Sequence, residues 1–124
     1  MIGEIRKAIT PYYDMKAKAT RFKSRPVLII AKADSSDFVA LPVSRVSRRQ
    51  NLSPDYDIEL DPANYPALNL NAVSYIRTHK QTVIHTSEIG DKIGNIKADY
   101  EDLYLDILTK RAQFSDEITN QAIK

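Results

Sequence analysis

Six side chains of this sequence have the chemistry to hold a phosphate group and to move protons around it. They are basic or carry a hydroxyl group: Arg25, Ser44, Arg45, Arg77, Thr78 and His79. Such donors can bind a phosphodiester and stabilise the negative charge of its transition state. His79 is a possible acid or base, and an arginine in a perturbed site is a less conventional one. Because RNA carries its own nucleophile, the 2′-hydroxyl group, these residues could cleave RNA without a metal ion or a nucleophilic serine.

Other kinds of catalytic site have little support in the sequence. His79 and His85 lie six residues apart with no carboxylate set around them, which is not a metal-ligand spacing. The three glycines form no phosphate-binding loop, and no Ser/His/Asp constellation is visible. We therefore expect neither a metal ion nor a cofactor. Plainer roles stay open for three residues: a surface histidine at His79, a strand-end hydroxyl at Thr78 and a solvated arginine at Arg25.

Further cations surround this set and predict a surface that binds single-stranded nucleic acid. Before Arg25 the basic residues fall at nearly every second position, with Tyr12, Tyr13 and Phe22 nearby. Phosphates would meet the charges and bases would stack on the rings. The residues expected to bind RNA are Lys16, Lys18, Arg21, Lys23, Arg45, Arg48, Arg77 and Thr78. A solvated loop or ribbon is the alternative for the stretch 12–24.

Length and composition favour a small cytoplasmic protein. A chain of 124 residues suits one domain, spanning 1–124, with a core large enough to fold unaided. The absence of cysteine fits a reducing cytosol, and we expect neither a membrane span nor a signal peptide. Residues 1–49 hold eleven Lys or Arg and four Asp or Glu, whereas residues 50–124 hold seven and twelve. A basic half and an acidic half indicate a polyanion-binding face with an acidic flank.

The elements that must position these residues are mostly strands. The apolar run after Pro26 predicts a strand covered on both faces, with Pro26 as its first residue and Arg25 at its end. Pro11 is expected to end the first strand, and Pro42 indicates an edge or a bulge. A helix is expected from an N-cap at Asp99, with a separate short helix over 116–123. Strands are expected at 2–9, 25–32, 38–43, 56–60, 71–77, 80–85 and within 87–96. This order predicts a mainly β (α+β) fold or a small barrel with a terminal helix.

The turn at residues 32–37 makes a geometric prediction about the candidate site. If 25–32 and 38–43 form an antiparallel hairpin centred near Asp34, paired residue numbers sum to about 69 or 70. Arg25 then lies opposite Ser44 or Arg45, with Cβ atoms about 5 Å apart. We therefore expect Arg25 and Ser44 to meet at the open end of the hairpin.

Four motifs, in this order and spacing, resemble the MazF/PemK toxins of type II toxin–antitoxin systems. They are Arg25-Pro26-Val27-Leu28-Ile29-Ile30, Leu41-Pro42-Val43-Ser44, Tyr75-Ile76-Arg77-Thr78 and Ile93-Gly94-Asn95-Ile96. The resemblance extends over about residues 2–110. It implies an SH3-like barrel of antiparallel strands with a C-terminal helix. It also implies a homodimeric, metal-independent endoribonuclease, neutralised by an antitoxin whose largely disordered tail lies across the RNA-binding surface.

The resemblance also assigns roles to residues and leaves one other function open. Arg25 matches the family's catalytic arginine, and Ser44 matches a position usually held by a catalytic threonine. Arg77 and Thr78 match an Arg-Thr pair near the RNA groove. The basic, glycine-free stretch 12–24 and the pair His79-Lys80 depart from the family pattern. The alternatives are a non-catalytic toxin of the same fold that poisons DNA gyrase, as CcdB does, and an RNA-binding barrel without activity.

Overall fold

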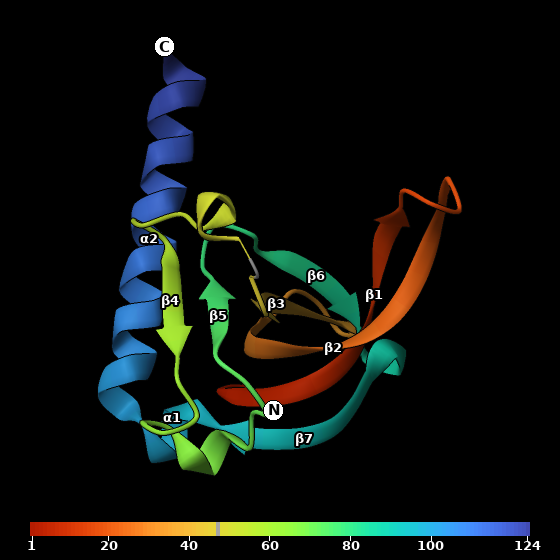
Figure 1. Ribbon diagram of the computed structural model, residues 1–124. Coiled ribbons are helices and arrows are strands. Elements are labelled where there is room, and N and C mark those ends of the chain that lie inside the picture. Colours follow the sequence, from red (N-terminus) through yellow and green to blue (C-terminus); the bar gives the residue numbers. More distant parts are fainter. Residues whose placement is uncertain (47) are drawn as a thin grey trace.

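The protein is built on one strongly curled antiparallel sheet with a helix at the C-terminal end, as the computed structural model shows (Figure 1). The structure describes residues 1–46 and 48–124. The strands are β1 (Glu4–Asp14), β2 (Ala19–Lys32), β3 (Asp37–Ser44), β4 (Asp57–Leu60), β5 (Ser74–Arg77), β6 (Thr82–His85) and β7 (Ile89–Asn95). They follow the order β4-β5-β3-β2-β1-β7, and β6 also pairs with β3. The expectation of a mainly β fold with a C-terminal helix is confirmed.

Helical segments fill the connections and the C-terminal end. They are η1 (Arg49–Asn51), η2 (Pro66–Leu68), η3 (Thr86–Glu88), α1 (Ile96–Asp99) and α2 (Glu101–Ile123). Among the described residues, no helix is both long and apolar enough to cross a membrane.

The central strand β2 is covered on both faces, as its apolar run predicts. Val27, Leu28 and Ile29 are each at most 1% exposed. Successive side chains of a strand point to opposite faces, so Leu28 joins one apolar cluster while Val27 and Ile29 join another. The first cluster also receives the buried side chains of α2, namely Leu103, Tyr104 and Ile107. The sheet therefore has two cores, and α2 closes one of them.

The two ends of α2 differ from the expected ones. Asn95, rather than Asp99, caps the helical region: its side chain accepts a hydrogen bond from the Ala98 N–H at the start of α1. Tyr100 then joins α1 to α2. The expected break before residues 116–123 is wrong, since α2 runs unbroken to Ile123. Phe114, beyond the middle of α2, packs edge-on against Tyr56 in the turn before β4.

The stretch 12–24 forms a long β-ribbon, one of the two forms that its composition left open. Strands β1 and β2 stay paired out to Asp14 and Ala19, and this pair of strands projects from the sheet (Figure 1). We call residues 9–24 the hairpin arm. The expected strand end at Pro11 is wrong. Pairing of β1 with β7 ends at Ala8, so Pro11 lies on an edge where a residue without an N–H is tolerated.

Two other prolines mark places where β-pairing changes. The sequence predicts Pro26 at a strand start, but it lies inside β2 and pairs with Lys7. It directly precedes the pairing of β2 with β3, which begins at Val27. Pro42 of β3 lies between the residues that pair with β6 and those that pair with β5, so on that side it pairs with neither strand. Pro26 and Pro42 thus each lie where the hydrogen-bonded pairing with a neighbouring strand ends.

The register of the central hairpin agrees with the turn arithmetic. Val27 pairs with Pro42 and Leu28 with Leu41, so residue numbers sum to 69 in this part of the hairpin. This pairing ends at Val27 and Pro42, and Arg25 and Ser44 lie two residues beyond it, where a continued register would set them opposite each other. The strands thus bring these two residues together at the open end of the hairpin.

Candidate functional site

A basic groove of about 920 Å³ lies at the open end of the β2–β3 hairpin. Its walls come from β1, β2, β3, β7 and the segment around η2. The charged residues among the described groove lining are five cations and one carboxylate: Lys7, Lys23, Arg25, Arg45, Lys92 and Asp91. This imbalance favours a ligand that carries several negative charges.

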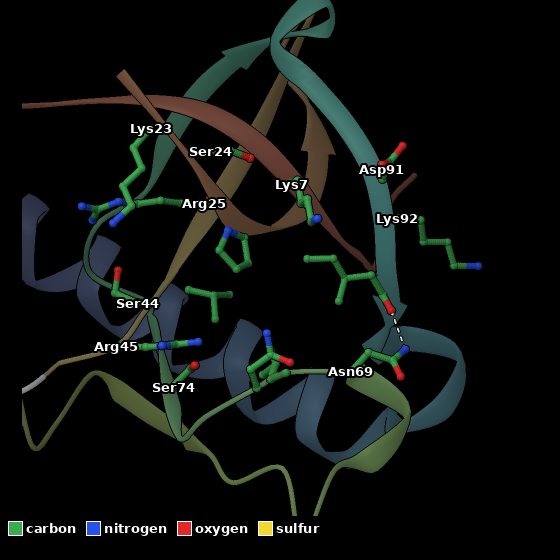
Figure 2. Close-up of a pocket in the computed structure, with 15 residues that line it drawn as sticks. Lys7, Lys23, Ser24, Arg25, Ser44, Arg45, Asn69, Ser74, Asp91 and Lys92 are labelled. Atoms are coloured by element: carbon green, nitrogen blue, oxygen red, sulfur yellow. Dashed lines mark hydrogen bonds between the residues drawn. The ribbon is translucent and has the colours of Figure 1, made fainter. Parts of the chain in front are cut away.

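Arg25 and Ser44 occupy the mouth of this groove. Figure 2 shows the Ser44 hydroxyl group pointing toward the Arg25 guanidinium group from the facing strand. Both residues also line an adjoining cavity of about 450 Å³. Within the described part of the chain, no carboxylate lies within ion-pair distance of Arg25. The neighbour of its guanidinium group is the ring of Tyr12, whose centroid is 5.5 Å away. The positive charge of Arg25 is therefore available to an anionic ligand.

The opposite wall of the groove depends on a glycine. A Cβ atom at Gly94 of β7 would lie 2.9 Å from Leu68 Cα and 3.0 Å from the Ala67 carbonyl oxygen. The missing side chain lets η2 approach β7 closely. Asn69, in a left-handed conformation with φ of 54°, closes this wall by donating from Nδ2 to the Ile93 carbonyl oxygen at 2.8 Å (Figure 2).

Arg77 and Thr78 lie elsewhere, in a structural cluster at the ends of β4 and β5. Arg77 Nε donates to Asp57 Oδ1 at 3.1 Å, and Nη2 donates to the Asn51 carbonyl oxygen at 2.9 Å. Thr78 is 1% exposed, and its hydroxyl group donates to the Tyr56 carbonyl oxygen at 2.6 Å. Neither residue lines the groove. The sequence grouped them with Arg25, but the fold uses them to hold the segment 51–57.

His79 belongs to the same structural cluster. Its ring centroid is 6.0 Å from those of Tyr56 and Phe114. Its Nδ1 atom lies 3.8 Å from Asp57 Oδ1 and has no hydrogen-bond partner within the described residues. Burial lowers the pKa of His79, and nearby Asp57 opposes that shift. The structure therefore places His79 outside the groove, in an environment that favours the neutral ring.

The contact with α2 reinforces this cluster. Phe114 lies at 5.0 Å from the Tyr56 ring, edge to face. The Tyr56 hydroxyl group donates a hydrogen bond to Glu117, and this bond raises the pKa of Tyr56 to about 12. Nearer the start of the helix, Lys110 Nζ donates to the Asp55 carbonyl oxygen at 3.0 Å. Residues 110–117 of α2 thus contact the segment next to Arg77, while the turns after them are exposed.

The remaining predicted RNA-binding residues are spread along the groove and the arm. Lys23 and Arg45 line the groove, whereas Arg48 is exposed just before η1 and does not. On the arm, Arg21 pairs with Asp14 at 3.2 Å, and its side chain remains 60% exposed. Lys16 and Lys18 lie in the turn at the tip, where the Asp14 side chain accepts from the backbone N–H groups of residues 16 and 17. Lys18 adopts a left-handed φ of 52° there.

Two cations of the groove were missed by the sequence reasoning. Lys7 enters it because β1 pairs Lys7 with Pro26. Lys92 enters it from β7, whose pairing with β1 contains register shifts next to Arg6. The residues next to Lys7 and Lys92 in the sequence do not indicate that these side chains reach the groove, since each position depends on pairing between distant segments. Among the described residues, no cluster of three His, Asp or Glu side chains could hold a metal ion.

Comparison with known proteins identifies the family. The model of the PemK-like, MazF-like toxins of type II toxin–antitoxin systems matches residues 9–108. Among solved structures, the chain is similar to Mycobacterium tuberculosis toxin MazF-mt6, with 19% sequence identity and a TM-score of 0.61. That match covers 91% of this chain and 96% of the other. A search of curated proteins gives no match. Because the family match spans most of the sheet and both residues at the groove mouth, the chain belongs to the PemK-like, MazF-like toxins of type II toxin–antitoxin systems.

Proposed function

We propose that the protein is a cytoplasmic toxin that cleaves single-stranded RNA without a metal ion. The observation that carries this proposal is the Arg25–Ser44 pair at the mouth of a basic groove, with no carboxylate from the described residues on Arg25. A guanidinium group left free in this way can bind the phosphate of a nucleic acid. The other groove cations would hold the neighbouring phosphates.

In the proposed reaction, the RNA supplies the nucleophile. A 2′-hydroxyl group attacks the adjacent phosphorus and releases its proton to water, and the bond from phosphorus to the 5′-oxygen breaks. The products are a 2′,3′-cyclic phosphate, which can open to a 3′-phosphate, and a free 5′-hydroxyl group. Arg25 stabilises the negative charge of the phosphorane and gives a proton to the leaving oxygen, which it regains from solvent, while Ser44 donates a hydrogen bond to a phosphate oxygen. His79 lies outside the groove and takes no part in this scheme.

The proposal includes two protein partners. A type II toxin is neutralised by an antitoxin, and an acidic, partly disordered antitoxin segment would compete with RNA for the cations of the groove. A second copy of the chain would form a two-fold homodimer, the commonest symmetry of soluble oligomers. Light scattering at micromolar concentration tests the dimer, and a monomeric mass would contradict it.

Cleavage of RNA in excess EDTA is the direct test of the activity. We expect the wild-type protein to cut single-stranded RNA and to leave 5′-hydroxyl ends, which polynucleotide kinase can label without prior phosphatase treatment. Arg25→Ala, prepared in parallel, controls for a contaminating ribonuclease. A requirement for added Mg²⁺ would contradict the proposed mechanism. Loss of RNA cleavage together with trapping of gyrase on DNA would favour the alternative toxin function.

A further inference from the structure

One tyrosine of the hairpin arm contacts Arg25. The guanidinium carbon of Arg25 lies 5.5 Å from the centre of the Tyr12 ring, within the range of a cation–π interaction. The register of β1 and β2 explains this contact. Arg25 pairs with Ala8, and Tyr12 pairs with Arg21. Alternate residues of a strand share a face, so Tyr12 lies on the same face of the ribbon as Arg25.

We propose that Tyr12 stacks on an RNA base beside the phosphate bound by Arg25, and that its ring also fixes the position of the guanidinium group. This inference rests on the proposed ribonuclease function. The Tyr12 side chain is partly exposed, so its ring is open to a ligand while it contacts Arg25. Aromatic side chains beside a cationic track bind single strands in this way because every base has a π-face.

The same register separates the neighbouring aromatic residues from Tyr12. Tyr13 pairs with Thr20 and Phe22 with Pro11, so both lie on the opposite face of the arm from Tyr12. Phe22 lines the cavity of about 450 Å³ that Arg25 and Ser44 also line, but the ring in cation–π contact with Arg25 is that of Tyr12. Tyr13 is 59% exposed and adjacent in sequence to Tyr12. It therefore provides a matched control with the same side chain.

The first test measures whether Tyr12 interacts with a particular base. A short RNA with a mapped cleavage site is made with an abasic nucleotide on either side of the cleaved phosphate. For the wild-type protein, one of these should lower kcat/KM by about 10- to 100-fold, the size of one base–aromatic stack. Tyr12→Leu should lower kcat/KM by a similar factor on intact RNA but should be insensitive to that abasic site.

The controls separate stacking from a general structural effect. Tyr12→Phe keeps the ring and should retain cleavage within about threefold, whereas Tyr13→Leu should keep both the rate and the full abasic penalty. A lower kcat at saturating RNA for Tyr12→Leu reports displacement of Arg25, and a higher KM reports loss of stacking. An unchanged abasic penalty in Tyr12→Leu would overturn the inference while leaving the ribonuclease function intact.

A second test reads stacking without any cleavage. The chain has no tryptophan, so Tyr12→Trp and Tyr13→Trp each introduce one fluorescent reporter. A mixed-sequence 2′-O-methyl RNA oligonucleotide, which lacks the attacking hydroxyl group, serves as the probe. Its binding should quench the tryptophan at position 12 strongly and that at position 13 little. Equal quenching, or none, would overturn the stacking role. Absence of both binding and cleavage by the wild-type protein would instead overturn the proposed function itself.

Discussion

Arg77 ends β5, and Arg25 lies within β2 just before its pairing with β3 begins, yet the fold gives these two arginines opposite environments. Arg77 donates to Asp57 and to the Asn51 carbonyl oxygen, and its side chain is 21% exposed. Arg25 faces a groove and contacts an aromatic ring. An arginine whose charge is already matched by a carboxylate stabilises the protein. One without such a partner is free to bind a ligand, so the pairing of the charge, more than the residue type, separates the two roles.

The largest expected effect is the loss of cleavage on changing the groove pair. Arg25→Ala and Ser44→Ala should each lower the single-turnover rate by about 10²–10³-fold, because each removes a donor to transition-state charge. Since both donors would touch one phosphate, the double variant should lose less than the product of the two single losses. The Tm of all three variants should remain close to that of the wild type. An Arg25→Ala variant that unfolds would remove the distinction between the two arginines.

The corresponding change at Arg77 should affect stability instead. Arg77→Ala leaves the Asp57 carboxylate, whose side chain is 2% exposed, without its ion-pair partner. We expect the free energy of unfolding to fall by about 3 kcal/mol, as measured by urea denaturation. Arg77→Ala combined with Asp57→Ala should be less destabilised than the sum of the single variants. A fully folded Arg77→Ala protein with no cleavage would show that Arg77 acts on the substrate after all.

A smaller loss of stability is expected where α2 covers the Arg77 cluster. Phe114→Ala removes an aromatic side chain that contacts both Tyr56 and His79, and should lower the free energy of unfolding by about 1–2 kcal/mol. Leu105→Ala, at a helix position that is 53% exposed, is the control and should change it by less than about 0.5 kcal/mol. Equal effects of the two substitutions would mean that Phe114 contributes nothing to the cluster.

The pH dependence of stability reports the same cluster. Burial holds the pKa of His79 below its usual value of 6.5, with Asp57 opposing and Arg77 and Lys80 adding to the shift. The unfolded chain therefore takes up the His79 proton at a higher pH than the folded protein does. The stabilisation is complete above pH 6.5 and decreases as the pH falls toward the pKa of the folded state. Denaturation at pH 8 and pH 5 should show this decrease, and His79→Gln should reduce it.

The smallest expected effect concerns the tip of the arm. Replacing Lys16 and Lys18 with alanine should flatten the dependence of RNA affinity on salt, by about 0.7 in the log–log slope for each phosphate that the variant no longer neutralises. Arg21→Ala should flatten it less, because Arg21 already pairs with Asp14. Fluorescence anisotropy at several salt concentrations measures these slopes. An unchanged slope for the lysine variant would mean that the tip does not reach the RNA.

The sequence predicted best what depends on neighbouring residues. The apolar run of β2 and the turn at 32–37 led to the correct central strand and to a pairing sum of 69 next to Arg25 and Ser44, which line one groove. It failed where distant segments decide the outcome. The partner of Arg77 is Asp57, twenty residues away on a strand whose pairing with β5 has no local signal. Lys7 and Lys92 likewise reach the groove only through the pairing of β1 with β2 and β7.

Pro11 also misled the prediction of where the first strand ends. Pro11 is expected to end a strand, which it would do in the middle of a sheet but not at a free edge. Residues 12–24 are polar and basic, a composition shared by loops and by exposed ribbons. An exposed ribbon differs from a loop in its strand pairing. Here β1 and β2 remain paired from Ile9 and Ser24 out to Asp14 and Ala19, as a continuation of their pairing within the sheet. The composition of the segment does not reveal that pairing.

The projecting arm has a consequence for how the protein opens. Beyond Ala8 the ribbon has two strands, and such ribbons are only marginally stable alone. Its amide protons should therefore exchange with solvent through local opening, far faster than those of Leu28 and Leu41 in the central strands. RNA lying along the arm would slow exchange at residues 10–24 without changing the slowest amides of the core. Slower amide exchange at residues 10–24 in the presence of RNA would therefore show that the RNA lies along the arm.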